Sequence, residues 1–448
     1  MPSEGRATRI NLLDFRTPPM RAFHMSWFAF FLCFFAWFGI APLMPIVRAE
    51  MGLTADQIGW CIIGSVAITV LSRLGIGRLC DSIGPRRAYA GLLILGSLPV
   101  MGIGLARDFE TFLLFRVAIG AIGASFVITQ YHTSVMFATN CVGTANATSA
   151  GWGNLGGGVT QMVMPLLFAG LIGAAGLSEA IGWRVAMMLA GLACLLMGVA
   201  YYLLTQDTPR GDLKDLRATG KLPWKSASDG SFWHAAKDSR VWALFVIYGA
   251  CFGIELTINN VAALYFADYF GMGLKAAGIA AAVFGLMNLF ARTLGGVFGD
   301  RFGGRWGLKG RVSWLFLAVF AEGIALMFFS QMTVLVLALP ALIVFSLFVQ
   351  MAEGATFSVV PFVNKKALGS VAGIVGAGGN AGAVAAGFLF KGAIPWPTAL
   401  LILGAAVTVC SFSAFAVRFS EAAEAEAASD FEAATGRRRE TILAGATA

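Results

Sequence analysis

The chain has 448 residues, of which 58% are hydrophobic and only 12% charged, whereas soluble domains carry about 25% charged residues, so the composition excludes a soluble fold. The formal net charge of +8 would fit a nucleic-acid partner. The basic residues, however, lie in short loops and termini between apolar spans, a distribution that orients membrane proteins. We therefore expect contacts with membrane lipid and none with nucleic acid.

Apolar stretches close to 20 residues long, the length that a hydrocarbon core of about 30 Å requires, recur along the whole chain. Because these stretches are continuous and do not alternate with polar residues, they argue against a membrane β-barrel. The sequence predicts an all-α membrane protein with 12 transmembrane helices. They are expected at about 26–47, 58–79, 88–106, 111–137, 146–172, 184–205, 241–266, 276–300, 312–331, 333–358, 369–390 and 396–418.

Polar segments divide these helices into two sets. We expect an N-terminal tail (1–25), a six-helix bundle (26–205), a linker (206–240), a second six-helix bundle (241–418) and a C-terminal tail (419–448) that is disordered or loosely helical. The loops around Arg86, around Arg301 and in the linker are basic, and those near Glu50 and Asp108 are not. By the positive-inside rule, both termini and the linker face the cytoplasm. We therefore expect a multi-pass protein of a bacterial cytoplasmic (inner) membrane, and a monomer.

Cysteine and histidine patterns give no sign of a cofactor. The seven cysteines lie in or beside apolar spans without a C-x-x-C pair, and the three histidines are scattered. We expect neither a metal site nor disulfides. No G-x-x-x-x-G-K-[ST] motif marks an ATP-driven pump, and neither the linker nor the tail offers the output domain that a sensor needs. The sequence favours a transporter over an enzyme or a receptor.

Two residue patterns occur once in each half. Five residues recur 219 positions later: Arg73, Gly77, Asp81, Gly84 and Arg86 correspond to Arg292, Gly296, Asp300, Gly303 and Arg305. Four others recur 226 positions later: Gly143, Gly153, Asn154 and Gly156 correspond to Gly369, Gly379, Asn380 and Gly382. Such a repeat predicts that the fold is a duplication of six helices.

The segment Gly77-Arg78-Leu79-Cys80-Asp81-Ser82-Ile83-Gly84-Pro85-Arg86-Arg87 resembles the signature between helices 2 and 3 of the major facilitator superfamily, and Gly296 to Arg305 resembles its second copy. The resemblance covers about residues 26–418. It implies two six-helix bundles that rock around a central site and expose it to each side in turn. We assign conformational gating to Gly77, Asp81, Arg86, Gly296, Asp300 and Arg305.

Arg73 and Arg292 are unusual because an arginine inside a membrane helix costs about 2.5–3.5 kcal/mol. Each lies eight residues before the aspartate of its copy, which places it about 12 Å inside the helix end. Two arginines facing each other at matched depth call for an anion. A planar guanidinium suits a planar oxyanion such as a carboxylate or nitrate. The alternative is an arginine paired with a buried glutamate, for example Glu255 or Glu353.

Two glycine-rich segments, Phe137 to Gly158 and Lys365 to Gly382, look like the paired nitrate signatures of the nitrate/nitrite porters. In that family Arg73 and Arg292 match the substrate-binding arginines. The resemblance implies nitrate or nitrite as cargo, covered by aromatic residues that Phe126, Tyr248 and Phe252 match best. The glycines by themselves predict close helix packing. Asn154 and Asn380 carry amides that can donate to an oxyanion.

Glu255 and Glu353 are the candidates for proton coupling, and Glu322 is a third intramembrane acid. Moving an anion against an inside-negative potential requires about 2.3 kcal/mol per charge per 100 mV, which proton symport or exchange for nitrite supplies. The glycine signatures resemble the assimilatory, plant-like branch more than the exchanger branch, which favours proton-coupled nitrate uptake. A nitrate/nitrite exchanger remains an alternative, as does a porter for another small anion such as formate or a sugar phosphate.

Overall fold

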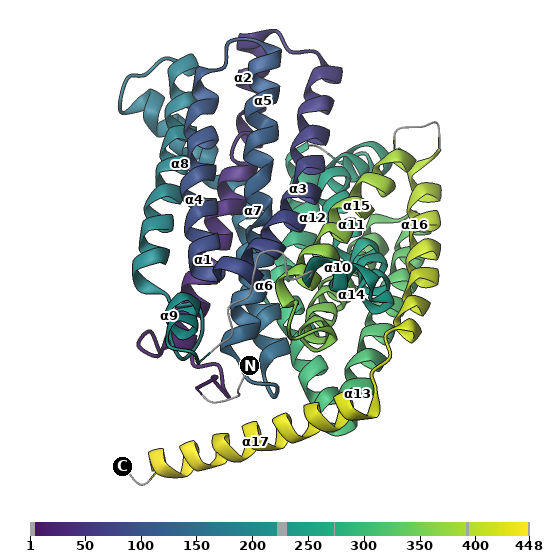
Figure 1. Ribbon diagram of the computed structural model, residues 1–448. Coiled ribbons are helices and arrows are strands. Elements are labelled where there is room, and N and C mark those ends of the chain that lie inside the picture. Colours follow the sequence, from purple (N-terminus) through teal and green to yellow (C-terminus); the bar gives the residue numbers. More distant parts are fainter. Residues whose placement is uncertain (1–4, 222–230, 273, 391–393, 447–448) are drawn as a thin grey trace.

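The computed structural model describes residues 5–221, 231–272, 274–390 and 394–446, and these residues are mostly helical (Figure 1). The helices of the first half, coloured purple to teal, stand beside those of the second half, coloured green to yellow (Figure 1). In the described ranges, β pairing is limited to two isolated bridges, Ala7 with Phe137 and Thr208 with Gly211. Residues 222–230 of the expected linker lie outside the described residues.

The first half holds six crossings. The first, α1, begins at Pro18 and not near residue 26, because proline is well suited to the first helical turn. A short 3-10 segment, Ala121–Ala124, joins α5 and α6 into a single crossing. The helices are α1 (Pro18–Phe38), α2 (Met44–Met51), α3 (Ala55–Ile83), α4 (Pro85–Gly102), α5 (Phe109–Gly120), α6 (Ser125–Met136), α7 (Val142–Gly173) and α8 (Glu179–Leu204).

The second half repeats this order after two short linker helices, α9 (Leu213–Ala218) and α10 (Ser231–Lys237). It contains α11 (Ser239–Phe270), α12 (Leu274–Leu286), α13 (Ala291–Ser330), α14 (Leu335–Val363), α15 (Leu368–Phe390) and α16 (Trp396–Ser411), which continues as a 3-10 helix, Phe412–Ala416. The last helix, α17 (Glu421–Ala446), follows the membrane region.

The long helix α13 contains the end of the crossing expected at 276–300 and nearly all of the one expected at 312–331. Its 40 residues would span about 60 Å if straight, about twice a hydrocarbon core. The backbone leaves the helical region at Trp306 and at Gly307, where φ is +66° and a residue without a Cβ is favoured. Among the described residues, eleven segments are long and apolar enough to cross a membrane, and one of them, Ile279–Ser330, covers 52 residues. Divided at the bend, it supplies two crossings, so the predicted all-α architecture of 12 helices in two bundles is confirmed.

One end of the molecule, which we name the basic face, is formed by the α3–α4 turn with Arg86 and Arg87, the α13 bend with Arg301 to Arg311, and the α14–α15 turn with Lys365. Helix α17 runs along this end, and the N-terminal segment lies there too (Figure 1). Glu424 of α17 accepts hydrogen bonds from the backbone N–H groups of Leu308 and Lys309, at 2.8 and 3.1 Å. The C-terminal tail is therefore a helix that is held at the bend of α13.

Glycines allow helices to approach closely where the repeated segments pack. A Cβ built on Gly382 of α15 would lie 2.2 Å from the carbonyl oxygen of Gly249 in α11. A Cβ on Gly156 of α7 would lie 2.1 Å from the carbonyl oxygen of Phe31 in α1. Because a real Cβ would collide with these backbones, both positions require a glycine for the observed packing.

Candidate functional site

Two buried arginines, one from each half, lie against the same aromatic ring. Arg73 of α3 and Arg292 of α13 both have 0% exposure. The guanidinium carbons lie 5.1 Å (Arg73) and 5.6 Å (Arg292) from the centroid of the Phe126 ring on α6. Both distances fall in the range of cation–π contacts, about 6 Å or less. The structure thus brings the two arginines together in the centre of the protein, as their repeated positions suggested.

Arg73 is held by backbone oxygens. Its Nη1 donates to the carbonyl of Gly376 at 2.5 Å, and its Nε to that of Gly123 at 3.3 Å. Its Nη2 is buried and has no hydrogen-bond partner among the described residues. In this part of the chain no carboxylate forms an ion pair with Arg73, so its Nη2 is available to a ligand.

Arg292 has acidic neighbours instead. Its Nη1 forms an ion pair with Glu353 of α14 and lies 4.0 Å from Oε2 of Glu255 on α11. Its Nη2 donates to the hydroxyl oxygen of Tyr248 at 2.9 Å. The alternative anticipated from the sequence, an arginine paired with a buried glutamate, therefore applies to Arg292 and not to Arg73.

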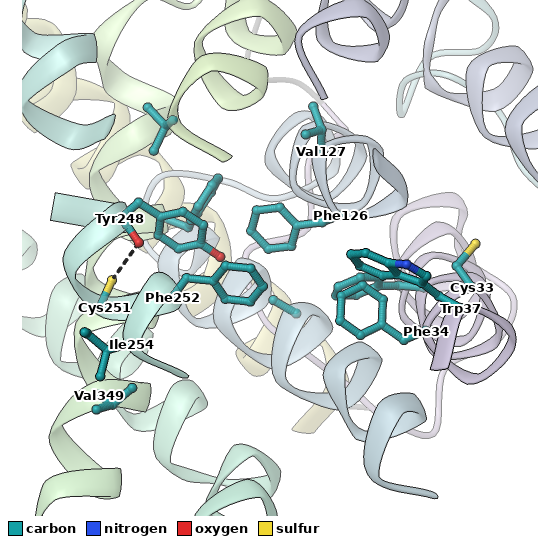
Figure 2. Close-up of a cluster of buried hydrophobic side chains, with 14 of the residues drawn as sticks. Cys33, Phe34, Trp37, Phe126, Val127, Tyr248, Cys251, Phe252, Ile254 and Val349 are labelled. Atoms are coloured by element: carbon teal, nitrogen blue, oxygen red, sulfur yellow. Dashed lines mark hydrogen bonds between the residues drawn. The ribbon is translucent and has the colours of Figure 1, made fainter. Parts of the chain in front are cut away.

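Stacked aromatic rings form one wall beside the arginines. Tyr248 and Phe252, one turn apart on α11, lie 5.2 Å apart with ring planes inclined by 3°. Phe126 stacks on them at 5.6 and 6.2 Å, and Figure 2 shows these three rings close together. Phe357 of α14 meets Phe126 edge-on at 4.9 Å. Sequence reasoning missed Phe357, although its position four residues after Glu353 places it on the same helix face.

Three amides surround Glu255. Its Oε1 accepts from Asn288 at 2.5 Å and from Gln350 at 3.2 Å, and its Oε2 from Asn154 at 3.5 Å. Asn288 and Gln350 were not predicted from the sequence. The signal was present, because Asn288 lies four residues before Arg292 and Gln350 three residues before Glu353.

The two predicted asparagines have different surroundings. Asn154 donates to Glu255, whereas Asn380 donates to the carbonyl oxygen of Val66 in α3 at 3.4 Å. The amide oxygens of both are buried without a partner in the described ranges. Neither residue hydrogen-bonds Arg73 or Arg292 in that part of the structure, so the repeat placed them at matched positions but did not predict their contacts.

Glu322 lies apart from this cluster, in the second segment of α13. It has 0% exposure, and both carboxyl oxygens are buried without a hydrogen-bond partner in the described ranges. The three intramembrane acids therefore differ. Glu353 contacts an arginine, Glu255 is bound by amides, and Glu322 has neither kind of contact among the described residues.

The two halves are joined at the basic face by a repeated arrangement. Asp81 of α3 accepts hydrogen bonds from the backbone N–H groups of Gly369 and Ser370, at 3.0 and 2.9 Å, at the start of α15. Asp300 of α13 accepts from those of Gly143 and Thr144, at 3.0 and 2.7 Å, at the start of α7. A carboxylate at a helix N-terminus is favoured by the free N–H groups and by the helix dipole. Each aspartate thus stabilises contact between the halves.

The glycines one turn earlier permit this contact. A Cβ on Gly77 would lie 2.3 Å from the carbonyl oxygen of Gly369, and one on Gly296 would lie 2.3 Å from that of Gly143. The two arginines of the repeat differ. Arg86 forms an ion pair with Asp212 of the linker, whereas Arg305 is exposed and lies 5.1 Å from the ring centroid of Trp306.

Asp207 joins the linker to the α3–α4 turn. Its carboxylate accepts hydrogen bonds from the backbone N–H groups of Arg86 at 2.9 Å and Leu213 at 3.0 Å. Burial raises the pKa of Asp207 to about 6, because the charged form loses its hydration.

Comparison with known proteins gives consistent results. Residues 26–386 match the family model described as Major Facilitator Superfamily. The chain is 39% identical to "High affinity nitrate transporter 2.5" of Arabidopsis thaliana, over 94% of this chain and 84% of that protein. It is 28% identical to "Nitrate/nitrite transporter NrtP" of Nostoc punctiforme, over 88% and 91% of the two chains. Among solved structures, the proton:xylose symporter XylE superposes with a TM-score of 0.66 at 13% identity, over 88% of this chain and 94% of that one, a similarity that concerns the fold alone.

Proposed function

This chain belongs to the major facilitator superfamily, and on that premise we propose that it is a secondary transporter that carries nitrate, with nitrite as a second cargo, by alternating access. The observation that carries the proposal is the pair of buried arginines that both lie against the ring of Phe126. The relatives named as nitrate transporters support the choice of anion.

The chemistry of the site favours a small planar anion. Arg73 offers an unpartnered N–H group, and Arg292 offers its guanidinium edge once Glu353 moves away. Nitrate has three equivalent oxygens in one plane, so it can accept from both guanidinium groups while its face lies against an aromatic ring. Formate has one oxygen fewer. A sugar phosphate is much bulkier and would have to displace the stacked rings of Phe126, Tyr248 and Phe252.

Charge balance favours proton symport over exchange. With Arg73, Arg292, Glu255 and Glu353 all ionised, the formal charge of the cluster is zero. A nitrate then adds an uncompensated negative charge to a buried site, which is costly. A proton taken up by Glu353 restores the balance and releases Arg292 for the anion. Nitrate and proton therefore bind cooperatively, which is what symport requires.

The Asp81 and Asp300 contacts support a gating role for the basic face. We propose that this face is cytoplasmic, as the positive-inside rule suggests, and that both termini lie in the cytoplasm of a bacterial cell. The described conformation, with this face held shut, then receives nitrate from outside. Gly77 and Gly296 allow the close approach, and Arg86 and Arg305 flank it. A monomer suffices, because one chain supplies both arginines.

Labelled nitrate counterflow in proteoliposomes tests the function. We expect trapped nitrate to accelerate the entry of labelled nitrate, nitrite to compete with it, and formate and a sugar phosphate to compete poorly. Liposomes without protein control for leakage. Competition by formate as strong as that by nitrite would overturn the choice of cargo.

A further inference from the structure

A cleft of about 700 Å³ opens on the basic face, between the N-terminal segment and helices α13 and α17. Arg9 and Thr144 of the first half contribute to one wall. Arg301 and Arg305 of α13, with Phe431 of α17, contribute to the other. Figure 1 shows the N-terminal segment and α17 at this same end of the molecule. The cleft therefore consists of parts that belong to both halves.

The charges that line this cleft are mostly of one sign. Arg9, Arg301 and Arg305 are exposed, and none of them forms an ion pair within the described ranges. Among the described residues of the lining, the only carboxylate is that of Asp300, which is already paired with Arg311 at 2.7 Å and bound to the start of α7. By contrast, Arg86, which matches Arg305 in the first half, is neutralised by Asp212. In the second half, Arg305 therefore has no carboxylate partner in the described ranges, and it lines the same cleft as Arg9 and Arg301.

We propose that this cleft binds a phosphate group, at a site separate from the buried arginine pair. Several guanidinium groups around one cavity favour a multivalent oxyanion, because each can donate a fork of N–H groups to phosphate oxygens. The volume lies within the range of about 300–1,000 Å³ that small-molecule sites occupy, and it exceeds what nitrate needs. The phosphate belongs to a soluble compound or to an anionic lipid headgroup.

Occupation of the cleft would hold the basic face closed. Asp300 both lines the cleft and bonds the start of α7 across the halves, so opening of this face separates the walls. A ligand that contacts both walls binds the closed state more tightly and shifts the population towards it. The phosphate group then acts as an inhibitor of transport. This effect on transport rests on the proposed alternating access, whereas binding itself does not.

Binding is tested on the purified full chain by thermal unfolding with inorganic pyrophosphate, against sodium chloride of equal ionic strength. The test variant is Arg9→Gln with Arg301→Gln, both exposed and outside the proposed gate. Arg87→Gln, an exposed arginine of the same face that does not line the cleft, is the control. We expect pyrophosphate to raise the unfolding midpoint of wild type and of the control, and not that of the double variant. Equal rises in all three proteins, or an equal rise with chloride, would overturn the site.

The source of the phosphate is tested in nanodiscs of phosphatidylcholine with and without phosphatidylglycerol. If the headgroup is the ligand, phosphatidylglycerol raises the unfolding midpoint of wild type and not that of the double variant. Pyrophosphate then causes no further rise in nanodiscs that contain phosphatidylglycerol. If a soluble compound is the ligand, pyrophosphate acts equally in both lipids. A double variant that responds like wild type in either arm contradicts the proposal.

Counterflow separates this inference from the proposed function. We expect pyrophosphate on both sides of the membrane to slow nitrate counterflow of wild type at least about five-fold, the lower end of typical coupling, and to leave the double variant unchanged. Counterflow that pyrophosphate does not slow would refute the inhibition and leave the nitrate transporter intact. Pyrophosphate binding without any nitrate counterflow would refute the proposed nitrate transport and leave the phosphate site intact.

Discussion

The two halves of this protein make the same aspartate contacts with each other, but their central arginines have different partners. Asp81 and Asp300 make the same pair of backbone contacts, each with the opposite half. Arg73 and Arg292 occupy equally matched positions, yet Arg73 is bound by carbonyl oxygens and Arg292 by Glu353. The duplication thus kept the aspartate contacts between the halves, whereas the partners of the two central arginines differ.

This difference assigns separate tasks to the two arginines. Arg73 has an available N–H group and forms no ion pair among the described residues, so under the proposed function it attracts the anion. Arg292 has an internal counter-ion that a proton can neutralise. Under the proposed function, the first half supplies attraction and the second half supplies coupling.

Replacing either arginine by lysine has the largest expected effect. Lysine keeps the charge but loses the planar fork. We expect Arg73→Lys and Arg292→Lys each to weaken nitrate binding at least about 30-fold, since truncating a partner in a buried charged hydrogen bond costs about 2–5 kcal/mol. Equilibrium binding of labelled nitrate to the folded variants measures this. Binding like that of wild type by either variant would remove that arginine from the site.

Replacing the gate aspartates should open the basic face, more so in the second half. Each substitution weakens the bonds to a helix N-terminus, and Asp300→Asn also leaves the buried Arg311 without its ion pair. Loss of one partner in a buried pair costs about 3–5 kcal/mol. We expect both variants to label Cys141 faster with a membrane-impermeant maleimide, and Asp300→Asn also to lower the unfolding midpoint.

Asp215→Asn, at an exposed position of the linker helix α9, serves as the control for this experiment. Labelling of Cys141 at the control rate in both gate variants would show that the aspartates do not hold the face closed.

Replacing the asparagines should have smaller and unequal effects. Asn154→Ala removes a donor from Glu255, and Asn380→Ala removes a bond to a backbone oxygen. One hydrogen bond contributes about 1 kcal/mol net, so nitrate affinity should fall about five-fold in each. Only Asn154→Ala should change the pH dependence of nitrate binding. Identical pH profiles would mean that Glu255 does not take part in coupling.

Leucine at Gly156 or Gly382 is the packing control for the asparagine variants. A side chain there meets a backbone oxygen of the neighbouring helix, so expression and stability should fall. If the asparagine and glycine variants behave alike, a ligand role for the amides has no support.

The smallest expected effect concerns the pH dependence of the linker contact, which only the first half has. The pKa of Asp207 is raised from 3.8 to about 6, so the folded state binds this proton more tightly than the unfolded state. Its contribution to stability is complete below pH 3.8 and is lost as the pH rises through about 6. We expect the unfolding midpoint of Asp207→Asn to change less than that of wild type between pH 4 and 7. An equal pH dependence in wild type and variant would contradict this.

The sequence predicted what the repeat determines. Spacing alone identified Asp81 and Asp300 as equivalent positions in the two halves, and likewise Arg73 and Arg292. This works because a duplicated backbone holds equivalent residues at the same depth. It offered a pairing with Glu255 or Glu353 only as an alternative and did not say which arginine would have it, because the rotation of α14 against α13 depends on side chains that the repeat does not share. The contacts of Asn154 and Asn380 differ for the same reason. Their helices repeat, but the acid beside Asn154 has no counterpart beside Asn380.

The most direct test of the account is proton uptake during nitrate entry into proteoliposomes, measured with a pH-sensitive dye. We predict that wild type takes up protons with nitrate, and that Glu353→Gln abolishes this uptake while nitrate counterflow continues. Glu322→Gln, a buried acid without an arginine contact in the described ranges, should retain it. An unchanged pH during nitrate entry into wild-type proteoliposomes, with strict dependence on internal nitrite, would contradict symport and establish exchange.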